Sequence, residues 1–256
     1  DKIEKILHDS SKELSEAEKD YWRNLNSKVE EPFQYGYYEG WEVIISAFEL
    51  LMFAVLAVCI VIAPVFSGEY QAGTDAVLLS GKYGKTKLTT AKILAALFFG
   101  VLAFTLHVLL AFGLPLAAFG TDGWNLPLQI NGTTVPYPLT FLEGTLINLG
   151  VIYLVLLAMI GVTLFLSARM KSPYLVLTVV VPVLFVPMFL SPNGTSGIYN
   201  LLVFLTPYKS LVPNFGSYLS YQFGPVVLDA FAVRTVLYAV LALILLPLAG
   251  RGFRRH

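Results

Sequence analysis

Glu49 and His107 are two ionisable side chains that stand inside long apolar stretches of this 256-residue sequence. Ionisable groups at membrane depth are costly, and they usually face a partner or a water-filled cavity. A carboxylate and an imidazole in such places could line a transport pathway or relay protons. His107 could equally be a hydrogen-bond donor between helices, and Glu49 could reach the aqueous interface. Neither residue identifies a transported substrate.

Patterns typical of enzymes are absent from the sequence. It contains no HExxH, no GxSxG and no clustered acidic pair within an apolar stretch. Gly84-Lys85-Thr86 imitates the end of a phosphate-binding GxxxxGK[ST] motif, but Leu79 occupies the position of the leading glycine and no hydrophobic strand precedes it. The single Cys59 allows no internal disulfide and no cysteine metal cluster. We therefore expect no enzyme activity, no catalytic or metal-binding residue and no cofactor in this chain.

Apolar stretches long enough to cross a bilayer define the fold class. The chain is 56% hydrophobic and 13% charged, with a mean hydropathy of +0.70, which a soluble domain of this size could not bury. About 20 apolar residues are needed for one membrane helix. We predict an all-α, polytopic membrane helical bundle over residues 41–256 with five transmembrane helices, at about 43–66, 93–119, 144–168, 174–190 and 231–249.

Basic residues predict how the chain is oriented, because short loops rich in Lys and Arg stay on the cytoplasmic side. Nine of the 17 Lys and Arg residues fall in three segments, which contain Lys82, Lys85, Lys87 and Lys92, then Arg169 and Lys171, then Arg251, Arg254 and Arg255. The C-terminus is therefore expected in the cytoplasm and residue 1 outside, in a multi-pass protein of the plasma membrane. The net charge is zero, which indicates no nucleic-acid partner.

Residues 1–40 are polar and are expected to form an extracellular juxtamembrane segment. Ser15 and Glu18 fit a capping box and Pro32 ends the run, which predicts a helix over residues 16–31. The segment holds no signal peptide, so we expect a sixth, N-terminal span upstream to carry it across the membrane.

A second extracellular segment separates the last two predicted spans. Its apolar part, Ile198 to Leu205, is too short to cross and is followed by Pro207, which predicts a re-entrant segment that packs against the bundle. We interpret the aromatic residues of this region as an interfacial belt: Tyr208, Phe215, Tyr218, Tyr221 and Phe223.

The first cytoplasmic loop is the most elaborate one, FSGEYQAGTDAVLLSGKYGKTKLTTAK from Phe66 to Lys92. We predict a short helix over residues 67–79 that lies along the inner membrane surface, has an apolar end at Val77, Leu78 and Leu79, and is broken by Gly81. Such a helix needs a protein partner or a lipid surface to cover its apolar end. Anionic lipid headgroups alone could satisfy the lysines.

This loop resembles the signature between the second and third spans of ABC transporter permeases of the type 2, exporter-like class. The residues that match the pattern in order are Phe66, Glu69, Gly73, Thr74, Leu78, Leu79, Ser80, Lys85, Leu88 and Lys92. The chain departs from the pattern between Ser80 and Lys87, where many relatives have a proline and an arginine and this sequence has glycines and lysines.

The resemblance implies that the loop is a coupling helix seated in a groove of a separate ATP-binding subunit, which holds the ATP and Mg. Two permease chains would pair, as a homodimer or heterodimer, to form the pathway in the lipid membrane. Glu69 would contact the ATPase, Gly73 and Thr74 would permit close approach, and Leu78 and Leu79 would provide apolar contact. The alternatives are a proton-coupled secondary transporter that uses Glu49 and His107, an intramembrane enzyme and a non-catalytic scaffold.

Overall fold

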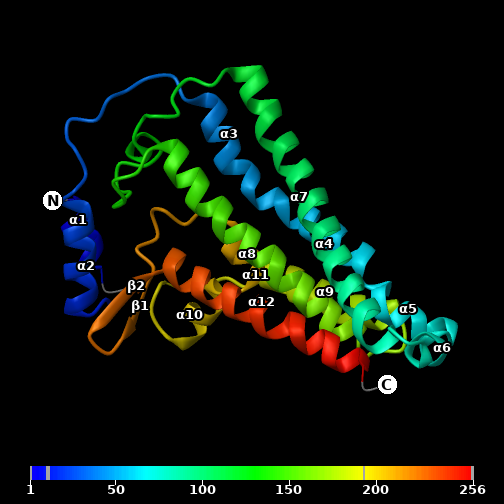
Figure 1. Cartoon of the computed structure of the whole chain (residues 1–256). Coiled ribbons are helices and arrows are strands. Elements are labelled where there is room, and N and C mark those ends of the chain that lie inside the picture. The colour runs from blue at the N-terminus through cyan, green and yellow to red at the C-terminus, as the bar shows by residue number, and fades with distance from the viewer. Residues whose placement is uncertain (1, 10–11, 193, 255–256) are drawn as a thin grey trace. The chain divides into compact units, whose positions relative to one another are not determined.

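The structure is a computed structural model that describes residues 2–9, 12–192 and 194–254 (Figure 1). The chain divides into two compact units. Unit 1 contains the residues up to Glu49 together with Leu110–Val151 and Pro187–Arg234, and unit 2 contains Leu50–Leu109, Ile152–Val186 and the residues from Thr235 onward. Arg255 of the predicted basic tail lies outside the described residues.

Four helical stretches within the described residues are long and apolar enough to cross a membrane. They are Glu39–Ala72, Gly84–Phe119, Phe141–Ser167 and Ala230–Arg254. A shorter apolar helix, Pro173–Met188, corresponds to the predicted span at 174–190. Its α-helical part ends at Phe185, and Pro187 lies in the 3-10 turn that follows. The helical membrane architecture agrees with the sequence, whereas the count of five spans stays a prediction.

Unit 2 contains whole helices and one part of each of the three longest ones. The elements that lie in it are α4 (Leu51–Ile62), α5 (Pro64–Ala72), α6 (Asp75–Ser80), the π-helical turn η2 (Gly84–Leu88), most of α7 (Thr89–Phe119), the second half of α8 (Phe141–Ser167), α9 (Pro173–Phe185) and most of α12 (Ala230–Arg254). Helix α9 begins at a favourable site, because Ser172 caps it and Pro173 occupies its first position. Helices α4 and α9 pack together, with the rings of Phe53 and Phe185 5.9 Å apart.

Unit 1 contains the N-terminal helices, the remaining parts of the long helices and a small hairpin. Its elements are α1 (Lys2–Leu7), α2 (Glu16–Asn26), α3 (Glu39–Ala47), the 3-10 turn η1 (Phe48–Leu50) up to Glu49, η3 (Leu128–Ile130), η4 (Val186–Met188) from Pro187, α10 (Ile198–Phe204), α11 (Pro207–Leu211), β1 (Ser220–Phe223) and β2 (Val226–Asp229). The two strands pair antiparallel, with Ser220 opposite Asp229. The sequence reading did not predict this hairpin.

Helix α2 begins where the sequence predicts, and a capping box of Ser15 and Glu18 is present. The helix ends at Asn26 instead of residue 31, because the Ser27 hydroxyl donates a hydrogen bond to the Asn24 carbonyl at 2.9 Å and competes with further helical bonds.

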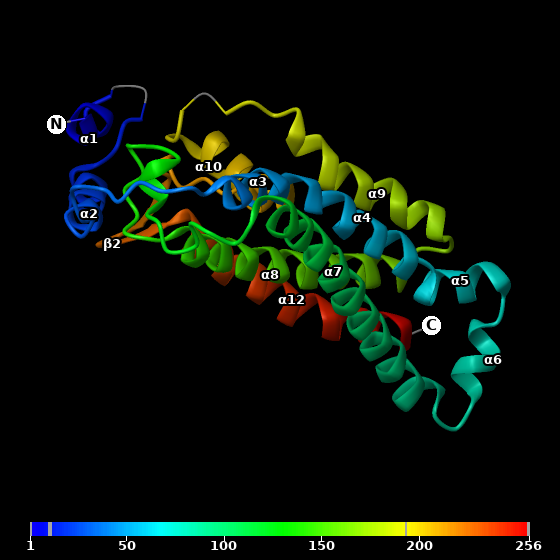
Figure 2. The ribbon, with the colours of Figure 1, turned by 90° about the horizontal axis from the view of Figure 1, so that it is seen from above.

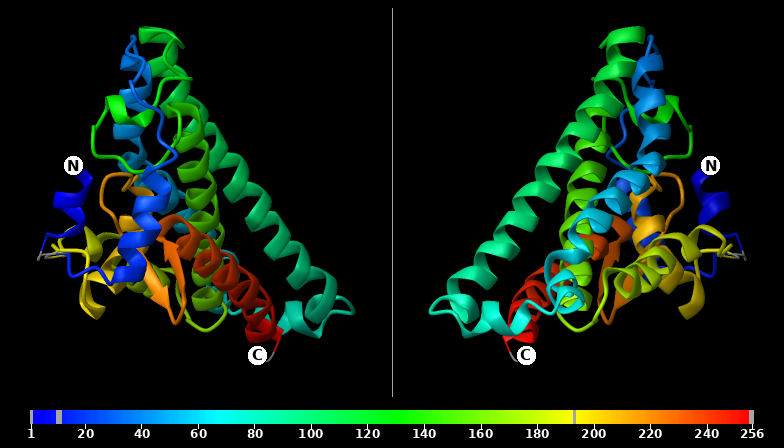
Figure 3. Two further views of the ribbon diagram at one scale, coloured as in Figure 1. Left: turned by 90° about the vertical axis from the view of Figure 1, so that its left-hand side faces the viewer. Right: turned by 90° about the vertical axis from the view of Figure 1, so that its right-hand side faces the viewer.

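A buried aromatic cluster joins α2 to the hairpin, and Figure 3 shows these elements beside each other. Trp22 is fully buried, and its indole N–H donates to Ser220 Oγ at 3.2 Å. The rings of Tyr218 and Tyr137 contact it edge-on, with centroids 5.3 and 5.7 Å away. Burial raises the pKa of Tyr218 to about 12, so its hydroxyl stays protonated and donates to the Thr134 carbonyl at 2.7 Å.

Burial overturns the interpretation of the second extracellular segment as an interfacial aromatic belt. Of the five aromatic residues assigned to the belt, only Phe223 is well exposed, whereas Tyr208, Phe215, Tyr218 and Tyr221 are buried in unit 1. A pattern of aromatic residues fits a membrane interface and a protein core equally well, because both accept an apolar ring with a polar tip.

Helices α10 and α11 form the predicted short apolar return, which we call the return segment (Ile198–Leu211). The helix is interrupted between Phe204, the last residue of α10, and Pro207, the first residue of α11. Arg234, a fully buried residue of α12, donates to the carbonyl of Phe204 at the end of α10 and to that of Lys209 in the last turn of α11, at 3.0 Å each. Buried Asn148 of α8 donates to Leu211 O at 3.1 Å. Backbone carbonyls in apolar surroundings need donors of this kind from the protein.

Candidate functional site

Two short helices and the turn between them correspond to the predicted coupling helix, and we call α5, the turn and α6 the elbow (Pro64–Ser80). The sequence predicts one helix over residues 67–79, whereas the structure breaks it at Gly73. Figure 2 shows α6 turning away from α5 before the chain enters α7. Gly81 ends α6, as predicted.

Gly73 makes the bend possible. Its φ is 68°, in the left-handed region that favours glycine. The Gly73 N–H donates to Tyr70 O at 3.2 Å and the Thr74 N–H donates to Glu69 O at 3.0 Å. These two bonds form a Schellman motif, which satisfies the last carbonyls of α5. The bend is therefore encoded locally.

Glu69 and Thr74, two predicted coupling residues, lie in contact with each other and with Lys92. The Thr74 hydroxyl donates to Glu69 Oε2 at 2.5 Å. Lys92 Nζ forms an ion pair with Glu69 Oε1 and donates to the Val65 carbonyl at 3.0 Å. The side chain of Glu69 is 25% exposed. In this structure Glu69 therefore ties the elbow to the first turns of α7 and keeps part of its carboxylate accessible.

The base of the elbow is fixed by Ser167, a buried residue near the end of α8. Its hydroxyl oxygen accepts hydrogen bonds from the N–H groups of Phe66 and Ser67, at 3.0 and 2.9 Å. It also lies 2.7 Å from the Ala63 carbonyl, to which it donates. Pro64 interrupts the helical hydrogen bonds at this point, so the N–H groups of Phe66 and Ser67 bond Ser167 Oγ in place of a backbone carbonyl.

Phe253 of α12 packs against helix α5. This ring is fully buried, with its centroid 4.5 Å from that of Phe66 and 5.8 Å from that of Tyr70. The Tyr70 hydroxyl donates to Ala168 O at 3.1 Å. Helix α5 is thus connected to α7, α8 and α12. The sequence analysis did not identify Ser167 or Phe253; the one available signal was a serine at the end of an apolar stretch.

Helix α6 holds Leu78 and Leu79, the remaining predicted coupling residues. Leu79 is buried and Leu78 is half-buried, whereas the preceding Val77 is 74% exposed. Leu79 therefore packs within the unit, and Val77 offers the apolar surface of this helix to the outside.

Gly84, which belongs to the apparent phosphate-binding pattern, has a packing role. A Cβ atom at this position would lie 1.8 Å from the Leu78 carbonyl oxygen, so only glycine allows η2 to approach α6 this closely. Its own carbonyl accepts a bond from Thr89 Oγ1 at 3.1 Å. The glycine of Gly84-Lys85-Thr86 is therefore explained by the contact between two helical turns.

The two residues predicted for a pathway have local partners and belong to different units. Glu49 is exposed in the turn η1 of unit 1 and accepts a hydrogen bond from the Tyr208 hydroxyl. His107 is exposed on α7 in unit 2, and its Nδ1 bonds Ala103 O in the preceding turn at 2.7 Å. Among the residues that the structure describes, no group of three or more His, Cys, Asp or Glu side chains could hold a metal ion.

Comparison with protein-family models, with curated proteins and with solved structures finds no match for this chain.

Proposed function

We propose that this chain is the membrane-spanning permease subunit of an ATP-binding cassette exporter of the type 2 class. The elbow would receive mechanical work from a separate ATP-binding subunit, which would bind ATP and Mg and carry out hydrolysis. A second permease chain would complete the pathway. The chain would lie in the plasma membrane with the elbow and the C-terminus on the cytoplasmic side.

The observation that carries this proposal is the bracing of the elbow. Helix α5 is bonded to α7 through Lys92, to α8 through Ser167 and packed on α12 through Phe253. A displacement of α5 would therefore be transmitted to three membrane helices, and a coupling element needs this property. Discrete packed arrangements, as opposed to continuous bending, would then give two states of the pathway.

The exposed surface of α6 and of the turn that follows it has the chemistry of a docking site. Val77 is the exposed apolar residue of α6, and Lys82, Lys85 and Lys87 are exposed in the turn that follows. Lys87 lies over the half-exposed ring of Tyr83, with 4.7 Å from Nζ to the ring centroid. An apolar residue beside several cations fits a partner groove with an apolar floor and an acidic rim.

Helix α7 supports the expected contact with lipid or with a second permease chain. Only 22% of the most apolar 18-residue stretch within Gly84–Phe119 is buried. Many of its large side chains are exposed, and five of them follow helical spacing along one side: Leu94, Phe98, Leu102, Leu106 and Leu109. A helix with such a surface needs an apolar environment along its length.

Val77→Asp tests the proposal with little risk to the fold, because the side chain is exposed. The full chain would be co-expressed with the neighbouring ATP-binding subunit and reconstituted in liposomes. We expect Val77→Asp to reduce permease-stimulated ATP hydrolysis by about tenfold or more, since an unpaired carboxylate in an apolar groove is costly. Val226→Asp, at a residue 51% exposed in the hairpin, is the matched control and should leave hydrolysis unchanged.

Two outcomes would contradict the proposal. The first is full stimulation by Val77→Asp together with retained co-purification of the ATP-binding subunit. The second is substrate flux that follows a proton gradient and needs no ATP, which is the behaviour of the alternative secondary transporter.

A further inference from the structure

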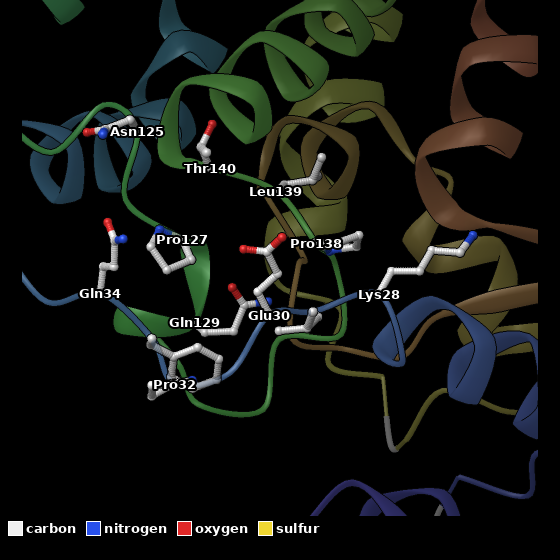
Figure 4. Close-up of a pocket in the computed structure, with 12 residues that line it drawn as sticks. Lys28, Glu30, Pro32, Gln34, Asn125, Pro127, Gln129, Pro138, Leu139 and Thr140 are labelled. Atoms are coloured by element: carbon white, nitrogen blue, oxygen red, sulfur yellow. The ribbon is translucent and has the colours of Figure 1, made fainter.

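A cavity of about 310 Å³ lies within unit 1, between the segment after α2 and the loop between α7 and α8. This volume suits a small organic molecule. Figure 4 shows the side chains around it. Its lining includes Glu30, Phe33, Gln34, Gln129, Leu139 and three prolines.

Gln129 is the unusual residue of this cavity. It is 1% exposed, and its Nε2 donates to Val135 O at 3.0 Å and to Tyr137 O at 2.7 Å. Two carbonyl partners fix the orientation of the amide, because only the NH₂ group can donate to them. The other atom, Oε1, is buried and has no hydrogen-bond partner among the described residues. A buried acceptor without a donor costs about 1 to 3 kcal/mol, so this oxygen favours a ligand that brings one.

Three prolines and two apolar side chains form one part of the cavity wall. Pro32, Pro127 and Pro138 have no backbone N–H. Phe33 and Leu139 add apolar surface. A ligand that enters therefore meets apolar contacts on this part of the wall, where the prolines provide no backbone donor.

Glu30 supplies a negative charge at the same place. It is exposed, and no ion pair joins it to another described residue. In Figure 4 its carboxylate and the Gln129 carboxamide lie in the middle of the lining side chains, whereas the ammonium of Lys28 is directed away from them. The carboxylate would be available to a cation in the cavity.

The loop that carries Gln129 is already ordered for binding. The Leu128 N–H donates to Leu139 O at 2.9 Å, and the Phe141 N–H donates to Leu126 O at 3.0 Å. Pro127 and Thr140 pair across the loop as an isolated β-bridge. A site held by its own backbone loses little conformational entropy when a ligand binds.

We propose that this cavity binds a small organic primary amine in its ammonium form. The ammonium group donates one hydrogen bond to Gln129 Oε1 and another to the Glu30 carboxylate, and the carbon skeleton packs between Phe33, Leu139 and the prolines. This site lies outside the elbow and is independent of the proposed coupling to ATP hydrolysis.

Three related compounds test which chemical group the cavity recognises. Their binding to the full chain in nanodiscs would be measured by saturation-transfer NMR. Phenethylamine should bind. Phenethyl alcohol, which has no charge, should bind at least about tenfold more weakly, because charged hydrogen bonds contribute most of the recognition. Phenethyltrimethylammonium keeps the charge but has no N–H, so its weaker binding would report on the two hydrogen bonds to Gln129 and Glu30 separately from the charge. Equal binding of the amine and either analogue would overturn the proposal, as would no binding of the amine.

Variants of the lining residues test whether the amine binds in this cavity. Glu30→Gln should weaken phenethylamine binding about tenfold, since it removes one charge-assisted hydrogen bond. Glu31→Gln removes the same charge from the next residue, which does not line the cavity, and should leave binding unchanged. Gln34→Trp should abolish binding by filling the cavity from an exposed position. Binding that survives both Glu30→Gln and Gln34→Trp would overturn the assignment. None of these measurements uses the ATP-binding subunit, so their failure would not count against the proposed function.

Discussion

Helices break in the elbow of unit 2 and in the return segment of unit 1. The backbone groups left without helical partners are bonded by a hydrogen-bond acceptor at the elbow and by a donor at the return segment. At the elbow, Ser167 accepts hydrogen bonds from the N–H groups of Phe66 and Ser67. At the return segment, Arg234 donates to the carbonyls of Phe204 and Lys209.

The difference follows from which end of a helix is left open. The first residues of a helix have N–H groups without partners and need an acceptor, whereas the last residues have free carbonyls and need a donor. One hydroxyl suffices near the start of α5. Near the ends of α10 and α11 the carbonyls lie apart, and the forked guanidinium of Arg234 reaches both. The comparison teaches that a buried polar residue in an apolar helix can be identified by the backbone groups that it completes.

Arg234→Met should have the largest effect. It removes the guanidinium donor from the carbonyls of Phe204 and Lys209, and Lys209 O keeps only the 3.4 Å bond from Asn214 Nδ2, so we expect the free energy of unfolding to fall by about 3 kcal/mol. Reversible unfolding in detergent would measure this loss. Arg251→Met is the matched control at an exposed position of the same helix and should change stability by less than about 0.5 kcal/mol. Equal stability of the two variants would remove the role given to Arg234.

Ser167→Ala should cost less, about 2 kcal/mol, because two backbone N–H groups lose one shared acceptor. The loss should be local, so hydrogen exchange at the Phe66 and Ser67 amides should become faster while exchange in the return segment stays the same. Ser80→Ala is the control, since that exposed hydroxyl bonds only Val77 O of its own helix. Unchanged exchange at Phe66 and Ser67 would show that Ser167 does not fix the elbow.

Gly84→Ala should destabilise the elbow by about 1 to 2 kcal/mol, because overpacking forces the backbone to shift. The added carbon would meet the Leu78 carbonyl, so protease cleavage near α6 should become faster. Gly81→Ala is a close control: its φ is −64°, and its Cβ would lie 3.3 Å from the same oxygen. If both substitutions are tolerated equally, the tight approach of η2 to α6 is not needed.

The ion pair of Glu69 and Lys92 should contribute least to stability, about 1 kcal/mol or less, because both side chains are partly exposed. A double-mutant cycle of Glu69→Gln and Lys92→Met would measure the coupling energy. The pair of Lys19 and Glu16 in α2, in which the Glu16 side chain is 78% exposed, is the reference and should give a smaller value. If the coupling energy of the elbow pair is near zero, Glu69 is free to contact a partner at no cost to the fold.

Local signals were read correctly from the sequence. Ser15 and Glu18 predicted the start of α2, and Gly81 predicted the end of α6, because caps and breakers act over one helical turn. Long apolar stretches likewise indicated membrane helices, since length and hydropathy are properties of the segment alone. The bend at Gly73 was missed although its signal was local; the glycine was assigned to close approach and not to a left-handed turn.

The sequence by itself determined the helical membrane class, the start of α2 and the end of α6, because each depends on a few neighbouring side chains. Tertiary structure alone decided which distant residues complete a broken backbone, as Ser167 does for the elbow and Arg234 for the return segment. It also decided that Tyr218 and Tyr221 belong to a core and that Gly84 packs against Leu78. The physical reason is that a hydrogen bond or a van der Waals contact depends on separation in space, and the chain order of an apolar helix does not specify which neighbour will be there.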